Sequence, residues 1–163
     1  ANRIRQNPMD FGNSTTFAVT CNIPQIAEQS IQLLRMVNYF GLGEVEWMYD
    51  PATDTYKFLE INTRAWKWHT ISNQLGFSFI GAMIDYYNGT TTIMANNTQS
   101  VGWVERLTDW TVIAKEILRG KMNINDVYKT YRIKKENAVW QWTDPLPGIM
   151  YILMAPILYI KRF

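Results

Sequence analysis

The stretch EVEWMYDPATDTYKFLEINTRAW, from Glu44 to Trp66, contains two strand-like segments separated by a turn. EVEWMY and YKFLEIN carry the aromatic and β-branched residues typical of strands, and DPATDT between them has the Asp, Pro and Thr residues typical of turns. We therefore predict a β-hairpin. Within it, Glu60, Asn62 and Arg64 stand two residues apart, so they would share one face of the second strand.

The register of this hairpin decides whether Glu46 joins that face. In one register Asp50 lies opposite Tyr56. Glu46 then faces Glu60, with Cβ atoms about 4.5–5.5 Å apart. In the other register Tyr49 lies opposite Tyr56, and Glu46 moves to the opposite face. The second register would bury Glu46 with aliphatic residues, so we prefer the first.

Two carboxylates and an amide oxygen supply only oxygen ligands, which is the chemistry that Mg²⁺ prefers. We predict a metal site formed by Glu46, Glu60 and Asn62. Arg64, further along the same face, would reach a phosphate oxygen. The alternative is a solvated hairpin face on which Arg64 forms an ordinary salt bridge.

The order of expected elements, a strand, a helix, the hairpin and then helices, predicts an α+β fold with a mainly antiparallel sheet packed with helices. A strand is expected over 13–23 and a helix from Pro24 onward. After the hairpin, helices are expected to end near Gly76 and Gly89, and 90–100 is a loop or a short edge strand. We assign 1–100 to one domain and 101–163 to a mainly helical C-terminal appendage.

Composition limits the function classes. The chain has 163 residues, 47% of them hydrophobic, and a net charge of +2. This charge balance argues against nucleic acid as a partner. A single cysteine, Cys21, excludes an internal disulfide and fits a cytoplasmic protein.

The most apolar segment is 148–160. At about 13 residues it is shorter than the roughly 20 that a membrane span needs, so we expect a docked C-terminal helix. The alternative is that this segment attaches peripherally to a membrane surface, with Lys161 and Arg162 at its end.

The segment GLGEVEWMYDPATDTYKFLEINTRAW, residues 41–66, resembles the metal-binding end of the ATP-grasp fold. IRQNPMDFGNSTTF resembles the strand before the preceding helix, and WKWHTISNQLGFSFIGAMIDYYNG resembles the helices that follow. AVWQWTDPLP is similar to the closing segment of predicted ATP-grasp carboligases related to D-aspartate ligase. The likeness extends over nearly the whole chain.

This resemblance implies the C-terminal subdomain of an ATP-dependent carboxylate–amine ligase. ATP would phosphorylate a small carboxylate, and an amine would displace phosphate from the acyl-phosphate. Glu46, Glu60 and Asn62 match the Mg²⁺ ligands of the family, and Arg64 matches its catalytic arginine.

Two departures from the family pattern restrict the expected chemistry. Relatives that use bicarbonate have an acidic residue four places beyond the motif arginine, where this chain has Trp68. The phosphate-binding lysines, adenine pocket and glycine-rich flap of the family are also missing from the sequence, so a missing N-terminal half of the same enzyme is an expected partner. The fragment alone would be inactive. The rival hypothesis is a degenerate, non-catalytic ATP-grasp module that binds a partner or closes an oligomer.

Arginine, histidine and tryptophan residues outside the hairpin are further candidates for contacts with ligand or for packing. Arg3 and Arg5 point the same way on an extended segment and are candidates for ATP phosphate contacts, with surface arginines as the alternative. His69 is expected to pack or cap a helix. Trp66 and Trp68 are candidates for a substrate-pocket wall. Four further tryptophans are expected in the core or at docked helices: Trp103, Trp110, Trp140 and Trp142.

Overall fold

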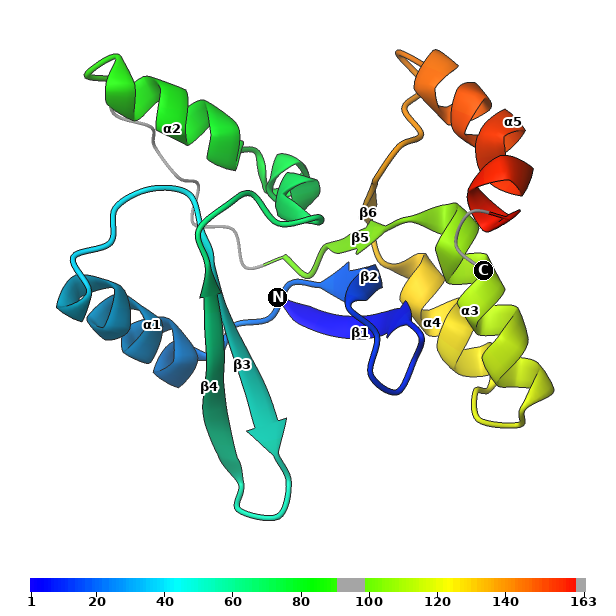
Figure 1. The fold of residues 1–163 in the computed structure, drawn as a ribbon, viewed down its shortest axis with the longest axis horizontal. Coiled ribbons are helices and arrows are strands. Elements are labelled where there is room, and N and C mark those ends of the chain that lie inside the picture. The colour runs from blue at the N-terminus through cyan, green and yellow to red at the C-terminus, as the bar shows by residue number, and fades with distance from the viewer. Residues whose placement is uncertain (91–98, 161–163) are drawn as a thin grey trace. The chain divides into compact units, whose positions relative to one another are not determined.

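The computed structural model of the protein describes residues 1–90 and 99–160 (Figure 1). The fold is α+β, as the sequence predicts. The chain divides into two compact units, which we call unit 1 (Ala1–Thr20 and Gln99–Phe163) and unit 2 (Cys21–Thr98). These units differ from the segments 1–100 and 101–163, whose assignment as domains stays a prediction.

Unit 1 is built on a four-stranded sheet in the order β1-β2-β5-β6. Its strands are β1 (Asn2–Asn7), β2 (Ser14–Val19), β5 (Gly102–Val104) and β6 (Lys135–Asn137). β2 pairs antiparallel with β1 and β5, and β5 pairs parallel with β6. Phe17, Ala18 and Trp103 are at most 1% exposed, so the two central strands form the core of this unit.

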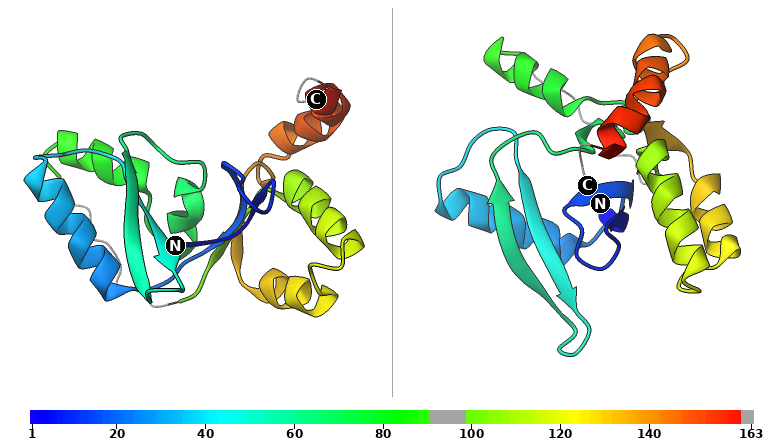
Figure 2. Two further views of the ribbon diagram at one scale, coloured as in Figure 1. Left: turned by 60° about the horizontal axis from the view of Figure 1, so that its bottom comes forward. Right: turned by 45° about the vertical axis from the view of Figure 1, so that its right-hand side comes forward.

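The helices of unit 1 are α3 (Arg106–Leu118), α4 (Ile124–Arg132) and α5 (Leu146–Ile160). α3 and α4 lie side by side next to the sheet in both figures that show the ribbon alone (Figures 1 and 2). Glu105 and Asn123 accept backbone hydrogen bonds from the first turns of α3 and α4, as N-cap residues do. Gly120, with φ of 69°, supplies the left-handed residue that follows α3.

A buried polar network joins these elements. Asp109 of α3 is fully buried and accepts bonds from Arg5 Nε and Nη2, both at 2.8 Å. It also accepts bonds from the hydroxyls of Thr16, at 2.9 Å, and Tyr131, at 2.8 Å. Arg5 donates in addition to Thr130 Oγ1, at 3.0 Å. One carboxylate therefore connects β1 and β2 to α3 and α4.

Unit 2 contains the hairpin strands β3 (Glu44–Asp50) and β4 (Thr55–Asn62) together with three helical segments. These are α1 (Pro24–Met36), the 3-10 helix η1 (His69–Leu75) and α2 (Phe79–Tyr87). Pro24 occupies the first helical position of α1, and Ser78 caps α2 by accepting a bond from the Gly81 amide. Gly76 ends η1 in the left-handed conformation.

Several sequence expectations are confirmed by these elements. The strand within 13–23, the helix from Pro24, the hairpin and the helical segments that end before Gly76 and Gly89 are all present. The predicted helical appendage also contains two strands, β5 and β6, that the sequence did not indicate. Most of the loop expected at 90–100, and also Lys161 and Arg162, lie outside the described residues. Among the described helices, none has both the length and the hydropathy needed to cross a membrane.

Loss of the Asp109 charge should strongly destabilise unit 1. Asp109→Asn leaves the buried Arg5 without its ion pair, and breaking a buried pair typically costs about 3–5 kcal/mol. Urea unfolding of the natural full-length protein and of the variant measures this difference. Asp126→Asn is the matched control, because Asp126 pairs with Lys129 on the exposed surface at 3.6 Å and should leave stability unchanged. Equal stability of both variants would contradict the central role of Asp109.

Alkaline pH should weaken unit 1 through Tyr131. Burial raises the pKa of Tyr131 well above its usual value of 10.0, and the negative charge of Asp109 raises it further. Above about pH 10 the unfolded chain loses this proton while the folded protein keeps it, so stability falls as pH rises.

Tyr131→Phe removes this contribution. Between about pH 9 and about pH 11.5, its free energy of unfolding should fall less than that of the parent protein. Urea unfolding across this pH range measures both slopes. Parallel slopes would show that Tyr131 ionises equally in both states.

Candidate functional site

The hairpin pairs in two registers that are separated by a β-bulge. Near the turn, Asp50 lies opposite Thr55 and Tyr49 opposite Tyr56. Beyond the register shift, Glu46 lies opposite Glu60. The predicted Glu46–Glu60 pairing is therefore confirmed, whereas the predicted pairing of Asp50 with Tyr56 is wrong.

The bulge inserts one extra residue, Leu59, into β4. Phe58 pairs with Trp47, while Glu60 pairs with Glu46, and neighbouring residues of β3 point to opposite faces. Phe58 and Glu60 therefore lie on opposite faces of the hairpin. Strict alternation along β4 would place both on one face, but the alternation stops at the bulge.

This change of register separates an apolar face from a polar face. The apolar face carries Val45, Trp47 and Tyr49 of β3 and Tyr56, Phe58 and Ile61 of β4. The Trp47 ring meets Phe58 edge-on with centroids 5.7 Å apart, and its indole N–H donates to Ser30 Oγ of α1 at 2.9 Å. The apolar face is thereby attached to α1.

On the polar face, Asn62 brings the two glutamates together. Its amide nitrogen Nδ2 donates to Glu46 Oε1 at 2.8 Å and to Glu60 Oε1 at 3.0 Å. The positive end of the amide thus lies between two carboxylates that would otherwise repel each other. We call Glu46, Glu60 and Asn62 the acidic cluster.

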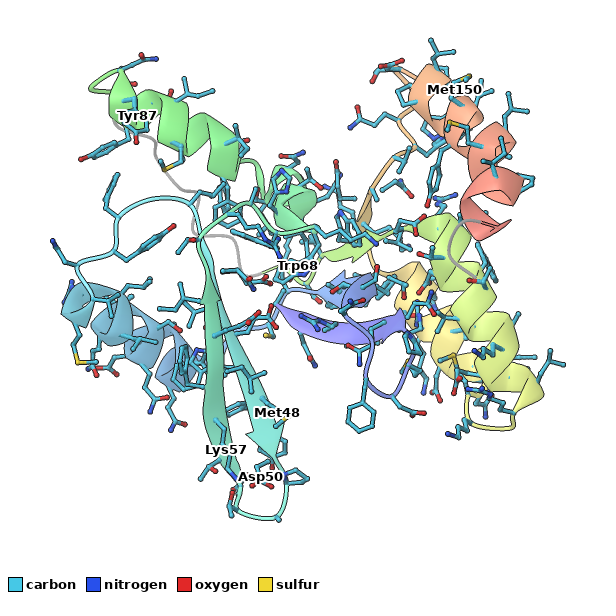
Figure 3. The ribbon with its side chains drawn as sticks, viewed as in Figure 1. Met48, Asp50, Lys57, Trp68, Tyr87 and Met150 are labelled. Carbon is cyan, nitrogen blue, oxygen red and sulfur yellow. The ribbon has the colours of Figure 1, made fainter. Side chains whose placement is uncertain are left out.

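The far end of the same face has its own polar contacts. Lys57 forms an ion pair with Asp50 near the hairpin turn, where both side chains are labelled in Figure 3. The bond from Lys57, together with bonds from Ala52 and Thr53, lowers the pKa of Asp50. These contacts stabilise the turn and involve none of the acidic cluster.

Arg64 lies two residues beyond the end of β4, and its side chain is exposed. Its Nη1 donates to the neighbouring Ala65 carbonyl at 3.4 Å. Because β4 ends at Asn62, the prediction that Arg64 shares a strand face with Glu60 and Asn62 is wrong. Its phosphate-binding role stays a prediction.

The two N-terminal arginines belong to unit 1. In β1, Arg3 pairs with Ala18 and Arg5 with Phe17, so a register shift places these arginines on opposite faces rather than the same one. Arg5 is 3% exposed, and its guanidinium is occupied by Asp109 and Thr130. We therefore leave Arg5 out of the proposed nucleotide site, while the phosphate contact of Arg3 stays a prediction.

Glu44 is an acidic residue that the sequence reasoning did not include in the site. It lies directly opposite Asn62, and it could have been found from its spacing of two residues from Glu46. In the described part of the chain, however, no three acidic, histidine or cysteine side chains form a group able to hold a metal. Any metal site here would consist of two carboxylates and an amide.

Aromatic residues follow the segment 60–64 in the sequence. Trp66 is 7% exposed and meets Trp68 and Phe79 edge-on. The Nδ1 atom of His69 lies 2.7 Å from the Trp66 carbonyl oxygen, at the start of η1. His69 is thus a packed histidine at a helix start, as predicted.

One comparison with known proteins gives a match that includes the hairpin. Residues 14–91 match the family model of the carbamoyl-phosphate synthase L chain, ATP binding domain. The match includes β2, α1, the whole hairpin and α2, and it indicates an ATP-grasp-type domain. No curated protein and no solved structure matches the chain.

Removing the amide from the acidic cluster should destabilise the hairpin. Asn62→Leu deletes both donated hydrogen bonds and leaves Glu46 and Glu60 facing each other. Bonds to charged groups contribute about 1.5–3 kcal/mol each when buried, so we expect a loss of about 1–2 kcal/mol at this partly exposed site. Urea unfolding of the full-length protein measures it.

The double variant Asn62→Leu with Glu60→Gln is the control. It removes the like-charge repulsion and restores an amide donor beside Glu46, so stability should partly recover. A double variant that is less stable than Asn62→Leu would contradict this account.

Proposed function

We propose that the protein is part of an ATP-dependent carboxylate–amine ligase, in which the hairpin supplies the ligands for Mg²⁺ and the ATP phosphates. The observation that supports this most directly is the convergence of Glu46 and Glu60 on the amide of Asn62, at 2.8 Å and 3.0 Å. The family match over residues 14–91 supports ATP as the nucleotide.

The acidic cluster fits Mg²⁺ in its chemistry. Mg²⁺ typically binds through one or two carboxylates together with substrate phosphates. In the structure the amide N–H₂ group of Asn62 stands where a cation would balance the two carboxylates. Rotation of this amide about its last side-chain bond would present its oxygen instead. Glu46, Glu60 and Asn62 would then all offer oxygen atoms.

When bound, Mg²⁺ would neutralise phosphate oxygens during phosphoryl transfer. Arg64 is the residue of this chain that we assign to the transferred phosphate, because its guanidinium matches phosphate geometry. Its exposure leaves this group accessible to a ligand.

The proposed reaction joins a small carboxylate to an amine. ATP transfers its terminal phosphate to the carboxylate and leaves as ADP, and the amine then displaces phosphate from the acyl-phosphate. Bicarbonate is disfavoured as the carboxylate, because Trp68 replaces the acidic residue found in bicarbonate-using relatives. The Trp68 ring instead packs edge-on against Trp66. We propose that the reaction is of the type carried out by D-aspartate-ligase-like enzymes.

We further propose that an N-terminal half supplies the remaining nucleotide contacts and that the enzyme acts in the cytoplasm. A non-catalytic module is the rival hypothesis. The two differ in whether the full-length protein turns over ATP in the presence of Mg²⁺.

Turnover should depend on the acidic cluster. Glu60→Ala and Asn62→Ala in the natural full-length protein should each abolish Mg²⁺-dependent ADP release in the presence of small carboxylates and amines. The physical reason is the loss of oxygen ligands at the phosphates, and electrostatic stabilisation of this kind typically contributes about a hundredfold or more to rate.

Asp50→Asn is the matched control, because Asp50 lies on the same face of the hairpin but takes part only in the turn contacts. It should retain parental turnover. Unchanged turnover in both Glu60→Ala and Asn62→Ala would reject the site, and a full-length protein without any turnover would favour the non-catalytic module.

A further inference from the structure

Unit 1 contains a partly open cavity of about 420 Å³ that lies at the start of α3. Its walls come from the end of β5, the first turns of α3, the segment after β6 and one side of α5. All of these parts belong to unit 1, so the cavity is defined within one compact unit. Its volume falls in the range of small-molecule sites, about 300–1,000 Å³.

Tryptophans form much of the cavity wall. Trp110, Trp140 and Trp142 all line it, and Trp140 and Trp142 meet edge-on with centroids 5.6 Å apart. Trp142 is 87% exposed and Trp110 is 54% exposed, so neither lies in the core, although Trp110 contacts Tyr131 of α4 as a residue between docked helices would. Their rings instead leave large apolar surfaces accessible beside a cavity.

Trp140 is held in place by its fit against α5. A Cβ atom at Gly148 would lie 2.4 Å from Trp140 Cε3, which is closer than any real contact. Glycine at this position therefore permits the indole ring to lie against the helix backbone. This close packing fixes one wall of the cavity.

Arg106 supplies a positive charge to the same wall. Its Nε donates to Asn137 Oδ1 at 2.7 Å, so a neutral side chain orients the guanidinium. Within residues 1–90 and 99–160, no ion pair joins Arg106 to an acidic side chain. Burial lowers the pKa of Lys135, and the nearby positive charge of Arg106 lowers it further.

The neighbouring acid does not balance Arg106. Glu105 also lines the cavity, but its Oε2 accepts from the amide and the hydroxyl of Thr108. It therefore serves as the N-cap of α3, where the positive end of the helix offsets its charge. The guanidinium of Arg106 is left as the group that would select a ligand by charge.

We propose that this cavity binds a small aromatic carboxylate. The planar group would lie against Trp140 and Trp142, where aromatic contacts are favourable, and the carboxylate would pair with the guanidinium of Arg106. The proposal uses residues of unit 1 only and does not depend on the acidic cluster or on the proposed ligase reaction.

Phenylacetate, its neutral amide phenylacetamide and the cation phenethylamine test this proposal by isothermal titration of the full-length protein. Phenylacetate should bind about 10- to 100-fold more tightly than phenylacetamide, the range expected for a charge-assisted pair. Phenethylamine should bind most weakly. Arg106→Gln should remove the preference for phenylacetate and leave phenylacetamide unchanged.

Arg119→Gln is the matched control, because Arg119 lies at the other end of α3 and pairs with Glu116. It should keep the parental preference. Trp142→Ala should weaken all three probes, and its high exposure means that the fold should tolerate the change, so this variant decides the question if Arg106→Gln does not fold. The proposal is overturned if no probe binds, if phenethylamine binds as tightly as phenylacetate, or if Trp142→Ala binds all probes normally.

Discussion

The ion pair between Arg5 and Asp109 is the constraint on which unit 1 depends. Asp109 is fully buried, and Arg5 is 3% exposed. Such a pair is tolerated only when the remaining polar atoms also find partners, and here Thr16, Thr130 and Tyr131 provide them. Because these groups come from two strands and two helices that are far apart in sequence, the pair fixes how β1 and β2 meet α3 and α4. The aromatic cavity is built from the first turns of the same helix α3.

In unit 2 the corresponding constraint is the bulge at Leu59. The change of register sends Phe58 to the apolar face beside Trp47 and Glu60 to the polar face beside Glu46. The apolar face is linked to α1 through the hydrogen bond from Trp47 to Ser30. The register that pairs Glu46 with Glu60 on one face thus accompanies the contact of Trp47 with Phe58 on the other face of the same two strands.

The sequence predicted the hairpin and the Glu46–Glu60 pair because side-chain alternation and turn chemistry are local properties. It did not predict the bulge, since Leu59 is a residue of ordinary strand type and no glycine marks the irregularity. β5 and β6 were missed because each has three residues, too few for a pattern to develop. The role of Arg5 was also out of reach, because its partner Asp109 lies 104 positions away. Likewise, the sequence could not show that Trp142 is exposed, because aromatic identity indicates burial only on average.

The bulge has a consequence for how the hairpin can vary. The ladder near the turn is held by the Tyr49–Tyr56 contact and the Asp50–Lys57 ion pair, and the ladder near the acidic cluster is held by a different set of side chains. Because the bulge separates the two ladders, a change in the 51–54 loop would act first on the ladder near the turn and not on the pairing of Glu46 with Glu60. The two ends of the hairpin are therefore held independently, one by contacts around the turn and the other by the hydrogen bonds of Asn62.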